Sequence, residues 1–449
     1  MKFHKSKKDI LNGYIPEQIL LFTIPICGSY LLQQLYQIAD AVVLGRFASV
    51  EALAAVGGSA TMVINVILNL ISGITTGAMV VVAQSYGRGD MDRVKSAVKT
   101  SMFIAIVFGG LISITSAFAT KPLLHAMKCP EETISLSLIY MYSYFIGLIP
   151  YSIYQFGLYI LRASGDTKIS LIFTIIISVT KIVLDLILTG LFRLGVWGVS
   201  ISTIVSYLIC GIAVLVIMHK TPDAYQYDIK DFGFEKEMLV KVFKIGVPVG
   251  IQSAVFAITN AYLSVKINEF GTNSIAAFSA YNNVDNFYWS FTNAIGAAIV
   301  TIVGQNYGNK NMQRVKQTLQ YGVIILGIAS IVIGAFEFTC AYPLIKLFTT
   351  DKEVIEIAVG MVRQIAISYS TYILVEMISG TIKGCGDSMN SMIIAIFGIC
   401  IVRFAYLIFG NFTSAKEVLY CYPISWAVTS VIFLIYYLTN KKYKLRNND

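Results

Sequence analysis

Seven ionisable side chains stand inside long apolar stretches of the sequence, and their types limit the chemistry that these stretches can support. A charge at the centre of a bilayer costs about 3 kcal/mol on insertion scales, so such a group usually faces a cavity or an opposite charge. Carboxylates in this setting bind protons or cations and mark pathways for ions and substrates. The seven residues are Asp40, Lys181, Asp185, Asp285, Glu337, Glu376 and Arg403.

The charges in the first half of the chain predict one shared site. Asp40 lies deep in its apolar stretch, fifteen residues after Pro25, which removes a helix hydrogen bond and can kink the helix. Lys181 and Asp185 are four residues apart, so they share a helix face and partly neutralise each other. We expect Asp40 to bind a proton or a cation in a cavity, with Lys181 and Asp185 in the same site. The alternatives are a solvated Asp40 near the outer interface and a purely structural Lys181–Asp185 ion pair.

The charges in the second half predict a second polar cavity. Arg403 is the deep cation there, and we expect Glu376 and Asp285 to be its partners. The stretch 275–303 is unusually rich in Asn and Asp, which indicates a water-filled lining rather than contact with lipid. Glu337 is expected towards the outer end of its stretch and is the weakest candidate. The expected cavity residues of the second half are Asn282, Asp285, Asn286, Glu376 and Arg403.

Aromatic residues suggest what such a cavity would hold. The sequence has 27 Tyr and 26 Phe, and many of them are expected in interfacial belts. The stretch 134–160 holds more tyrosines than a belt requires, and aromatic faces attract organic cations. Ordinary packing and belt positions remain the alternative for this cluster. The expected cavity aromatics are Tyr36, Tyr151 and Tyr154.

The elements that position these residues are membrane-spanning helices. Of 449 residues, 56% are hydrophobic and only 13% are charged, whereas a soluble domain carries about 25% charged residues. A span needs roughly 20 apolar residues, so the sequence predicts an all-α polytopic membrane protein with twelve transmembrane helices. The predicted spans are 17–44, 52–80, 97–119, 134–160, 169–191, 197–218, 245–265, 275–303, 319–342, 357–382, 389–411 and 418–439.

The chain is internally duplicated, with the second copy displaced by 221 residues. Gln84, Tyr86 and Gly87 meet Gln305, Tyr307 and Gly308, and the Gly165–Asp166 pair meets Gly386–Asp387. Each copy holds six spans, an even number, so the copies are parallel repeats that form two bundles around a central cavity. The predicted domains are a first bundle at 1–218, a cytoplasmic linker at 219–244 and a second bundle at 245–449.

Charge placement predicts the orientation. With both termini cytoplasmic, the inner segments hold 23 of the 34 Lys and Arg residues and the outer segments hold nine. This excess favours cytoplasmic termini in a multi-pass protein of the cell membrane. The net charge of +9 then mostly faces anionic membrane lipid. Because the basic residues are dispersed over many loops, we expect no nucleic-acid partner.

The sequence shows few residue patterns that are typical of an enzyme. Its three histidines are far apart, no pair has metal-ligand spacing, and the seven cysteines show neither metal nor redox spacing. No Ser or Cys nucleophile motif is visible. We therefore expect a protein that is not an enzyme and has no cofactor or bound metal, with a membrane enzyme as the alternative.

The paired motifs carry a resemblance to the multidrug and toxic compound extrusion (MATE) transporters, over nearly all of the chain. It rests on twelve spans in two copies, on Pro25 followed by Asp40, and on two pairs of loops. One pair is Val-Ala-Gln-Ser-Tyr-Gly at 82–87 and Val-Gly-Gln-Asn-Tyr-Gly at 303–308. The other is Leu-Arg-Ala-Ser-Gly-Asp-Thr at 161–167 and Lys-Gly-Cys-Gly-Asp-Ser at 383–388.

The resemblance implies a monomeric antiporter that exports small cationic or amphipathic compounds in exchange for H⁺ or Na⁺ by alternating access. The family's carboxylates in spans one and five map onto Asp40 and Asp185. The family often has Asn where this chain has Lys181, and an ammonium there can act as a tethered cation in place of Na⁺. With no acidic residue early in span seven, the chain is most similar to the DinF-like branch.

These observations lead to a hypothesis and an alternative. The hypothesis is that Asp40 takes and releases a proton while Lys181 stays paired with Asp185, which biases the bundle between two packings. The alternative is a lipid-linked precursor flippase of the same superfamily. Lys181 and Arg403 are the only deep cations in the sequence, which argues against a pyrophosphate-lipid cargo.

Overall fold

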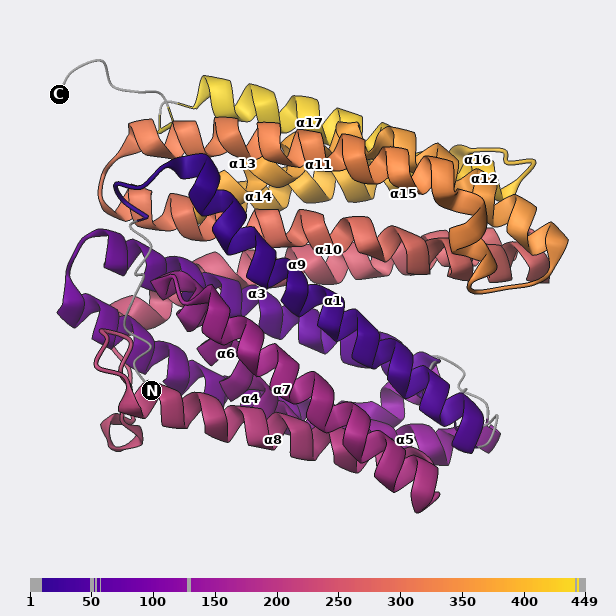
Figure 1. Cartoon of the computed structure of the whole chain (residues 1–449), viewed down its shortest axis with the longest axis horizontal. Helices are drawn as coiled ribbons and strands as arrows, with labels where there is room; N and C mark the ends of the chain where they lie inside the picture. The colour runs from indigo at the N-terminus through magenta and orange to yellow at the C-terminus, as the bar shows by residue number, and fades with distance from the viewer. Residues whose placement is uncertain are drawn as a thin grey trace. The chain divides into compact units, whose positions relative to one another are not determined.

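The computed structural model describes residues 10–48, 52, 55–56, 58–126, 131–440 and 442–443. All regular secondary structure in these ranges is helical (Figure 1). The basic residues at the two chain ends, on which the prediction of cytoplasmic termini partly rests, lie mostly outside the described ranges.

The contacts divide the chain into two compact units. The described part of the first unit lies within 28–250, and the described part of the second unit covers 10–27 and 251–443. Helices α1 and α9 therefore each contribute to both units, and each divides two residues after an internal proline, Pro25 or Pro248. The assignment of 1–218 and 245–449 to two bundles remains a prediction.

The helices before the linker are long and mostly apolar. They are α1 (Ile15–Phe47), α3 (Ser59–Gly87), α4 (Met91–Ala126), α5 (Glu131–Ile146), α6 (Leu148–Ser164), α7 (Thr167–Asp185), the π-helical η1 (Leu186–Leu191) and α8 (Val196–Lys220). A short 3-10 helix, η2 (Ile229–Asp231), lies in the linker. Within the first unit, α6 packs against α3, α4 and α8.

The second copy repeats this order with more interruptions. Its elements are α9 (Lys236–Asn268), α10 (Thr272–Gly308), α11 (Met312–Lys346), α12 (Lys352–Ser368), the 3-10 helix η3 (Tyr369–Tyr372), α13 (Ile373–Gly384), α14 (Ser388–Ala395), the π-helical η4 (Ile396–Ile401), α15 (Val402–Phe409), α16 (Ala415–Val418) and α17 (Cys421–Thr439). Within the second unit, α10 packs against α11, α12 and α13.

Helix ends repeat at the same displacement as the sequence. Helices α3 and α10 end at Gly87 and Gly308, and the following helices begin at Met91 and Met312, in both cases 221 residues apart. After the fourth span of each copy, Gly165 and Gly386 adopt left-handed φ angles of 100° and 81°. A glycine tolerates this conformation because it has no Cβ. The predicted duplication is therefore confirmed in the local structure.

The twelve predicted spans are confirmed, with one difference. Eleven described helices are long and apolar enough to cross a membrane, and a bent pair, Thr133–Ile146 with Leu148–Ser164, supplies the twelfth span. The two helices of this pair meet at Gly147 with a bend of 49°, where the sequence predicted one continuous helix. Pro150 explains the break, because it cannot donate the hydrogen bond that a continuous helix would direct to the Ile146 carbonyl.

Close helix approach in the first unit depends on glycines. A Cβ added to Gly73 on α3 would lie 2.1 Å from the backbone nitrogen of Gly250 on α9. One added to Gly77 would lie 2.4 Å from the carbonyl oxygen of Val242. Small residues allow helix backbones to approach in this way within a membrane, so the first part of α9 is held tightly against α3.

Candidate functional site

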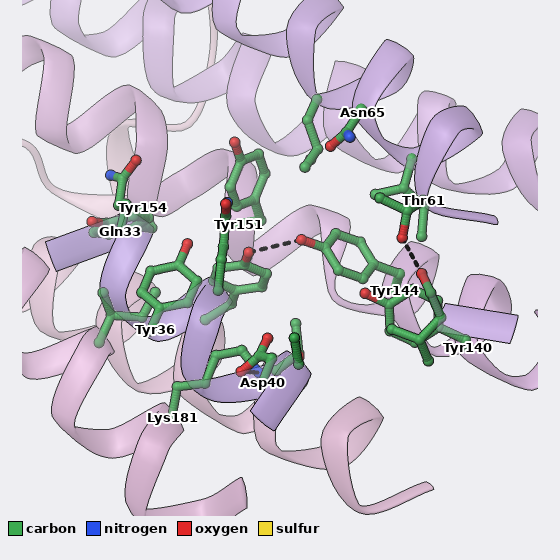
Figure 2. Close-up of a pocket in the computed structure, with 18 of the residues that line it drawn as sticks. Gln33, Tyr36, Asp40, Thr61, Asn65, Tyr140, Tyr144, Tyr151, Tyr154 and Lys181 are labelled. Carbon is green, nitrogen blue, oxygen red and sulfur yellow. Dashed lines mark hydrogen bonds and ion pairs between the residues drawn. The ribbon is translucent and has the colours of Figure 1, made fainter. Parts of the chain in front are cut away.

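The three charged residues predicted to share a site in the first half of the chain do lie together. Figure 2 shows two of them, Asp40 and Lys181, side by side. The Lys181 Nζ lies 2.9 Å from Asp40 Oδ1 and 3.1 Å from Asp185 Oδ2. Asp40 comes from α1, and the other two come from α7, so the ammonium joins two helices of the first unit. The site combines two carboxyl groups with one ammonium, and its formal charge is −1 when both carboxyls are ionised.

The two carboxyl groups of this site differ in their surroundings. The Asp185 side chain is fully buried, and its second oxygen accepts a hydrogen bond from the Ser202 hydroxyl on α8. The Asp40 side chain is 20% exposed and borders a cavity. The chain continues from Asp185 directly into the π-helical η1, and such segments are frequent at functional sites. Of the two, Asp40 is the carboxyl that a proton or cation can reach.

The cavity beside Asp40 has a volume of about 320 Å³. It lies within the first unit and is rich in tyrosine and carboxamide side chains. Figure 2 shows the predicted residues Tyr36, Tyr151 and Tyr154 around it, together with Asn65 and Gln33. Its remaining polar or aromatic lining residues are Gln37, Asp40, Thr61, Tyr140, Tyr144, Gln155, Lys181, Thr203 and Tyr207.

The tyrosines of the cavity are held by hydrogen bonds and by contacts between their rings. The hydroxyls of Tyr144 and Tyr207 are 3.0 Å apart, and the Gln155 side chain donates to the Tyr151 hydroxyl over 3.0 Å. The rings of Tyr151 and Tyr207 meet edge to face, with centroids 4.9 Å apart. Such contacts fix the ring positions and present electron-rich faces, which attract cations.

Sequence reasoning missed several of these lining residues, including Tyr207 on α8. On α1 a usable signal existed, because Gln33, Tyr36, Gln37 and Asp40 recur at spacings of three and four and so share one helix face. For Tyr207 the sequence offers no comparable signal, since it stands alone in an apolar stretch. Its position in the cavity depends on how α8 packs against α6.

In the second unit, the expected pairing of Arg403 with Asp285 or Glu376 is wrong. No ion pair joins Arg403 to either acid among the described residues. The Arg403 guanidinium instead donates to the Asn260 side-chain oxygen over 2.7 Å and lies 4.4 Å from the centroid of the Tyr422 ring. A neutral amide and an aromatic face are thus its main partners.

Among the described residues, no side-chain hydrogen bond or ion pair joins the other predicted residues of the second half to one another. Asp285 is buried, and Glu376 accepts a hydrogen bond from the Tyr372 hydroxyl over 3.2 Å. Asn282 and Asn286 are half-buried on α10, and their role in a cavity stays a prediction. Glu337, the weakest candidate, is only 1% exposed and contacts the Tyr369 hydroxyl. Across the described ranges, no group of three or more His, Cys, Asp or Glu residues is placed to hold a metal ion.

Comparison with known proteins shows that the chain matches a known family. The MatE family model matches residues 25–187 and 248–408. The chain is 25% identical to the probable multidrug resistance protein YoeA of Bacillus subtilis (strain 168), over 93% of this chain and 92% of that protein. It is 27% identical to the probable multidrug resistance protein YpnP of the same strain, over 96% of each.

Solved structures show the same fold. One of them is an outward-facing multidrug resistance MATE family transporter of the MOP superfamily, which has a TM-score of 0.88 and is 21% identical. The match covers 95% of this chain and 96% of that chain. The two-repeat architecture is therefore the MATE transporter fold.

Proposed function

Because this chain belongs to the MatE family of multidrug efflux transporters, we propose that it is an antiporter that exports organic cations in exchange for protons. Asp40 is the proposed proton-binding group, and the tyrosine-lined cavity beside it is the proposed cation site. We also propose that the protein lies in the cell membrane with both termini in the cytoplasm. It acts there as a monomer, and its two bundles give alternating access to the cavity.

The observation that carries the proposal is the charge of the Asp40–Lys181–Asp185 cluster. With both carboxyls ionised the cluster is −1, and one further positive charge makes it neutral. A proton on Asp40 or an organic cation beside ionised Asp40 can each supply that charge. If Asp40 were protonated while an organic cation was bound beside it, the largely buried site would carry a net positive charge, which is unfavourable. Proton and substrate therefore compete, and this competition is what an exchanger requires.

The nature of the cavity supports an organic cation as cargo. A volume of about 320 Å³ lies within the range of small-molecule sites, roughly 300–1,000 Å³. Its lining combines aromatic faces and neutral amides with the carboxylate of Asp40. Aromatic faces recognise quaternary ammonium groups without requiring a hydrogen-bond donor from them.

The position of Lys181 favours H⁺ over Na⁺ at this site. Its ammonium contacts both carboxylates at once and so fills the place that a bound metal cation would need. A second cation next to it would be repelled unless Lys181 moved. We propose that Lys181 is a permanent, tethered counter-ion and that the exchangeable charge is the proton on Asp40.

The test is transport of a fluorescent organic cation into proteoliposomes under a pH gradient or a Na⁺ gradient imposed separately. We expect the pH gradient alone to drive transport and Asp40→Asn to abolish it, because the amide cannot take up the proton. The matched control is Glu269→Gln, which neutralises an exposed acid and should leave transport unchanged. Transport driven only by Na⁺, full activity in Asp40→Asn, or no transport under either gradient would each overturn the proposal.

A further inference from the structure

Two buried carboxyl groups of the second unit share a single tyrosine hydroxyl. The Tyr369 oxygen lies 2.7 Å from Asp285 Oδ1 and 2.6 Å from Glu337 Oε2. The three side chains come from α10, α11 and η3, and all are at least nine-tenths buried. At a displacement of 221 the first copy has apolar or hydroxyl residues at these positions, so the arrangement is not part of the duplication.

Counting hydrogens shows that one carboxyl in this arrangement is protonated. Two contacts as short as 2.6 and 2.7 Å between oxygens each need a hydrogen atom. A phenol has one hydrogen to donate and can accept another. Tyr369 therefore donates to one carboxylate and accepts from the other carboxyl, which must carry a proton.

The remaining contacts place that proton on Glu337. Asp285 accepts a second hydrogen bond over 2.7 Å, from the Trp289 indole, so its charged form has two donors. Glu337 Oε1 is buried and has no hydrogen-bond partner in the described part of the chain. A carboxylate with an unsatisfied buried oxygen is costly, whereas a protonated carboxyl tolerates it better. This difference in hydrogen-bond donors between the two carboxyls therefore favours ionised Asp285 and neutral Glu337.

No described cation neutralises the pair. Arg403 on α15 bonds to Asn260, and Arg363 on α12 is exposed and donates to the Phe338 carbonyl. Neither forms an ion pair with Asp285 or Glu337 among the described residues. The other ionisable groups that interact with the pair are Tyr281 and Tyr288 on α10 and Tyr422 on α17, and Glu376 on α13 interacts with Tyr288. Like charges so close in a buried site disfavour ionisation of both acids.

We propose that Glu337 carries a second coupling proton, held through Tyr369 against ionised Asp285, which is released and rebound once in each transport cycle. This inference rests on the proposed proton-driven export and adds one proton per cycle to it. On release the proton passes to water, and the two carboxylates are left with the single hydrogen of Tyr369 between them. The two copies of the fold thus carry proton sites of different chemistry.

The location of Tyr369 indicates how the proton of Glu337 is released. It lies in η3, the 3-10 segment between α12 and α13, and a 3-10 segment within a helix often marks a hinge. Its ring stacks on Tyr288, with centroids 3.5 Å apart. A change at η3 that moves this ring removes the Tyr369 bridge between the two carboxyls. Glu337 then loses its partner and can exchange its proton.

The first test is infrared difference spectroscopy of the full-length protein in lipid nanodiscs during a pH titration. We expect a carbonyl band of a buried protonated carboxylic acid that persists at neutral pH. Glu337→Gln should remove it, since the amide cannot hold the proton, while Asp40→Asn and the exposed control Glu269→Gln should retain it. All three changes replace a carboxyl by an amide of the same shape, so folding should survive. A band that is absent in the wild type, or retained in Glu337→Gln, would overturn the inference.

The second test counts coupled protons from the substrate ratio reached at equilibrium, with the membrane potential held at zero. At a pH difference of about one unit, each coupled proton changes this ratio about tenfold. Glu337→Gln should therefore accumulate about tenfold less substrate than wild type, and an unchanged ratio would refute the coupling role. If the infrared band behaves as expected but the pH gradient drives no transport in the wild type, the proposed function fails and protonated Glu337 stands.

Discussion

Replacing Lys181 by asparagine removes the ammonium that separates Asp40 from Asp185. At an effective dielectric of about 20, the contacts at 2.9 and 3.1 Å are gross attractions of about 5–6 kcal/mol each. Because both carboxylate oxygens touch one nitrogen, they are at most about 6 Å apart, and their repulsion is then at least about 3 kcal/mol. The variant therefore loses both attractions and leaves the repulsion between the two carboxylates uncompensated.

The variant can relieve this repulsion by binding a proton or a metal cation. Without such compensation, removing one partner of a buried pair typically costs about 3–5 kcal/mol. If Lys181 occupies the place of a cation, the asparagine variant should bind Na⁺ between the two carboxylates. Na⁺ at about 100 times its Kd would then restore about 2.7 kcal/mol.

The assay is thermal unfolding of the purified protein in sodium chloride or in choline chloride of equal ionic strength. We expect the Tm of Lys181→Asn to lie below that of wild type in choline and to recover in Na⁺, while wild type shows no such response. In proteoliposomes a Na⁺ gradient should begin to drive transport. The matched control is Lys266→Asn, which breaks an exposed pair with Glu269 and should change the Tm little, because exposed ion pairs contribute little to stability. The reasoning would be refuted if Na⁺ did not change the Tm of Lys181→Asn, or if it raised the Tm of wild type equally.

Two further predictions concern the packing of α3 against α9 and a hydrogen bond of the linker. Gly77→Ala should lower the Tm, at a cost of about 1–3 kcal/mol, because its Cβ would meet the Val242 carbonyl oxygen at 2.4 Å. Gly110→Ala should not, because its Cβ would make an ordinary contact with the Ile149 side chain at 3.8 Å. Tyr225→Phe loses a 2.8 Å hydrogen bond to Asp166, worth about 1 kcal/mol. Burial raises the pKa of Tyr225, so its contribution should be present below pH about 10 and decline above it. A Tm difference between wild type and Tyr225→Phe that grows above that pH would contradict this.

The twelve spans, the duplication and the Asp40–Lys181–Asp185 cluster could be predicted because each follows from a strong local rule. Apolar length is set by bilayer thickness, and a charge inside such a stretch needs a partner. Lys181 and Asp185 are neighbours on one helix face, so their contact requires no knowledge of tertiary structure. In this membrane protein, the restrictions imposed by lipid made sequence patterns unusually informative.

In the second half of the chain, the partners of charges on different helices were not predictable in the same way. Arg403 contacts Asn260 and the Tyr422 ring instead of an acid, and Glu337 meets Asp285 only through Tyr369. These contacts depend on the rotation and depth of each helix, which the period of a sequence pattern does not specify. Tyrosines on both sides of the bend at Gly147 line the cavity, and the sequence pattern did not indicate this bend.

The sequence by itself determined the class of protein, the repeat, the spans and the one charge cluster built largely from a single helix. Tertiary structure alone decided which side chains line the cavity and which carboxyls share the Tyr369 hydroxyl. The physical reason is that burial in lipid acts on each helix separately, whereas hydrogen bonds between buried side chains form only where packed helices bring donor and acceptor within about 3 Å.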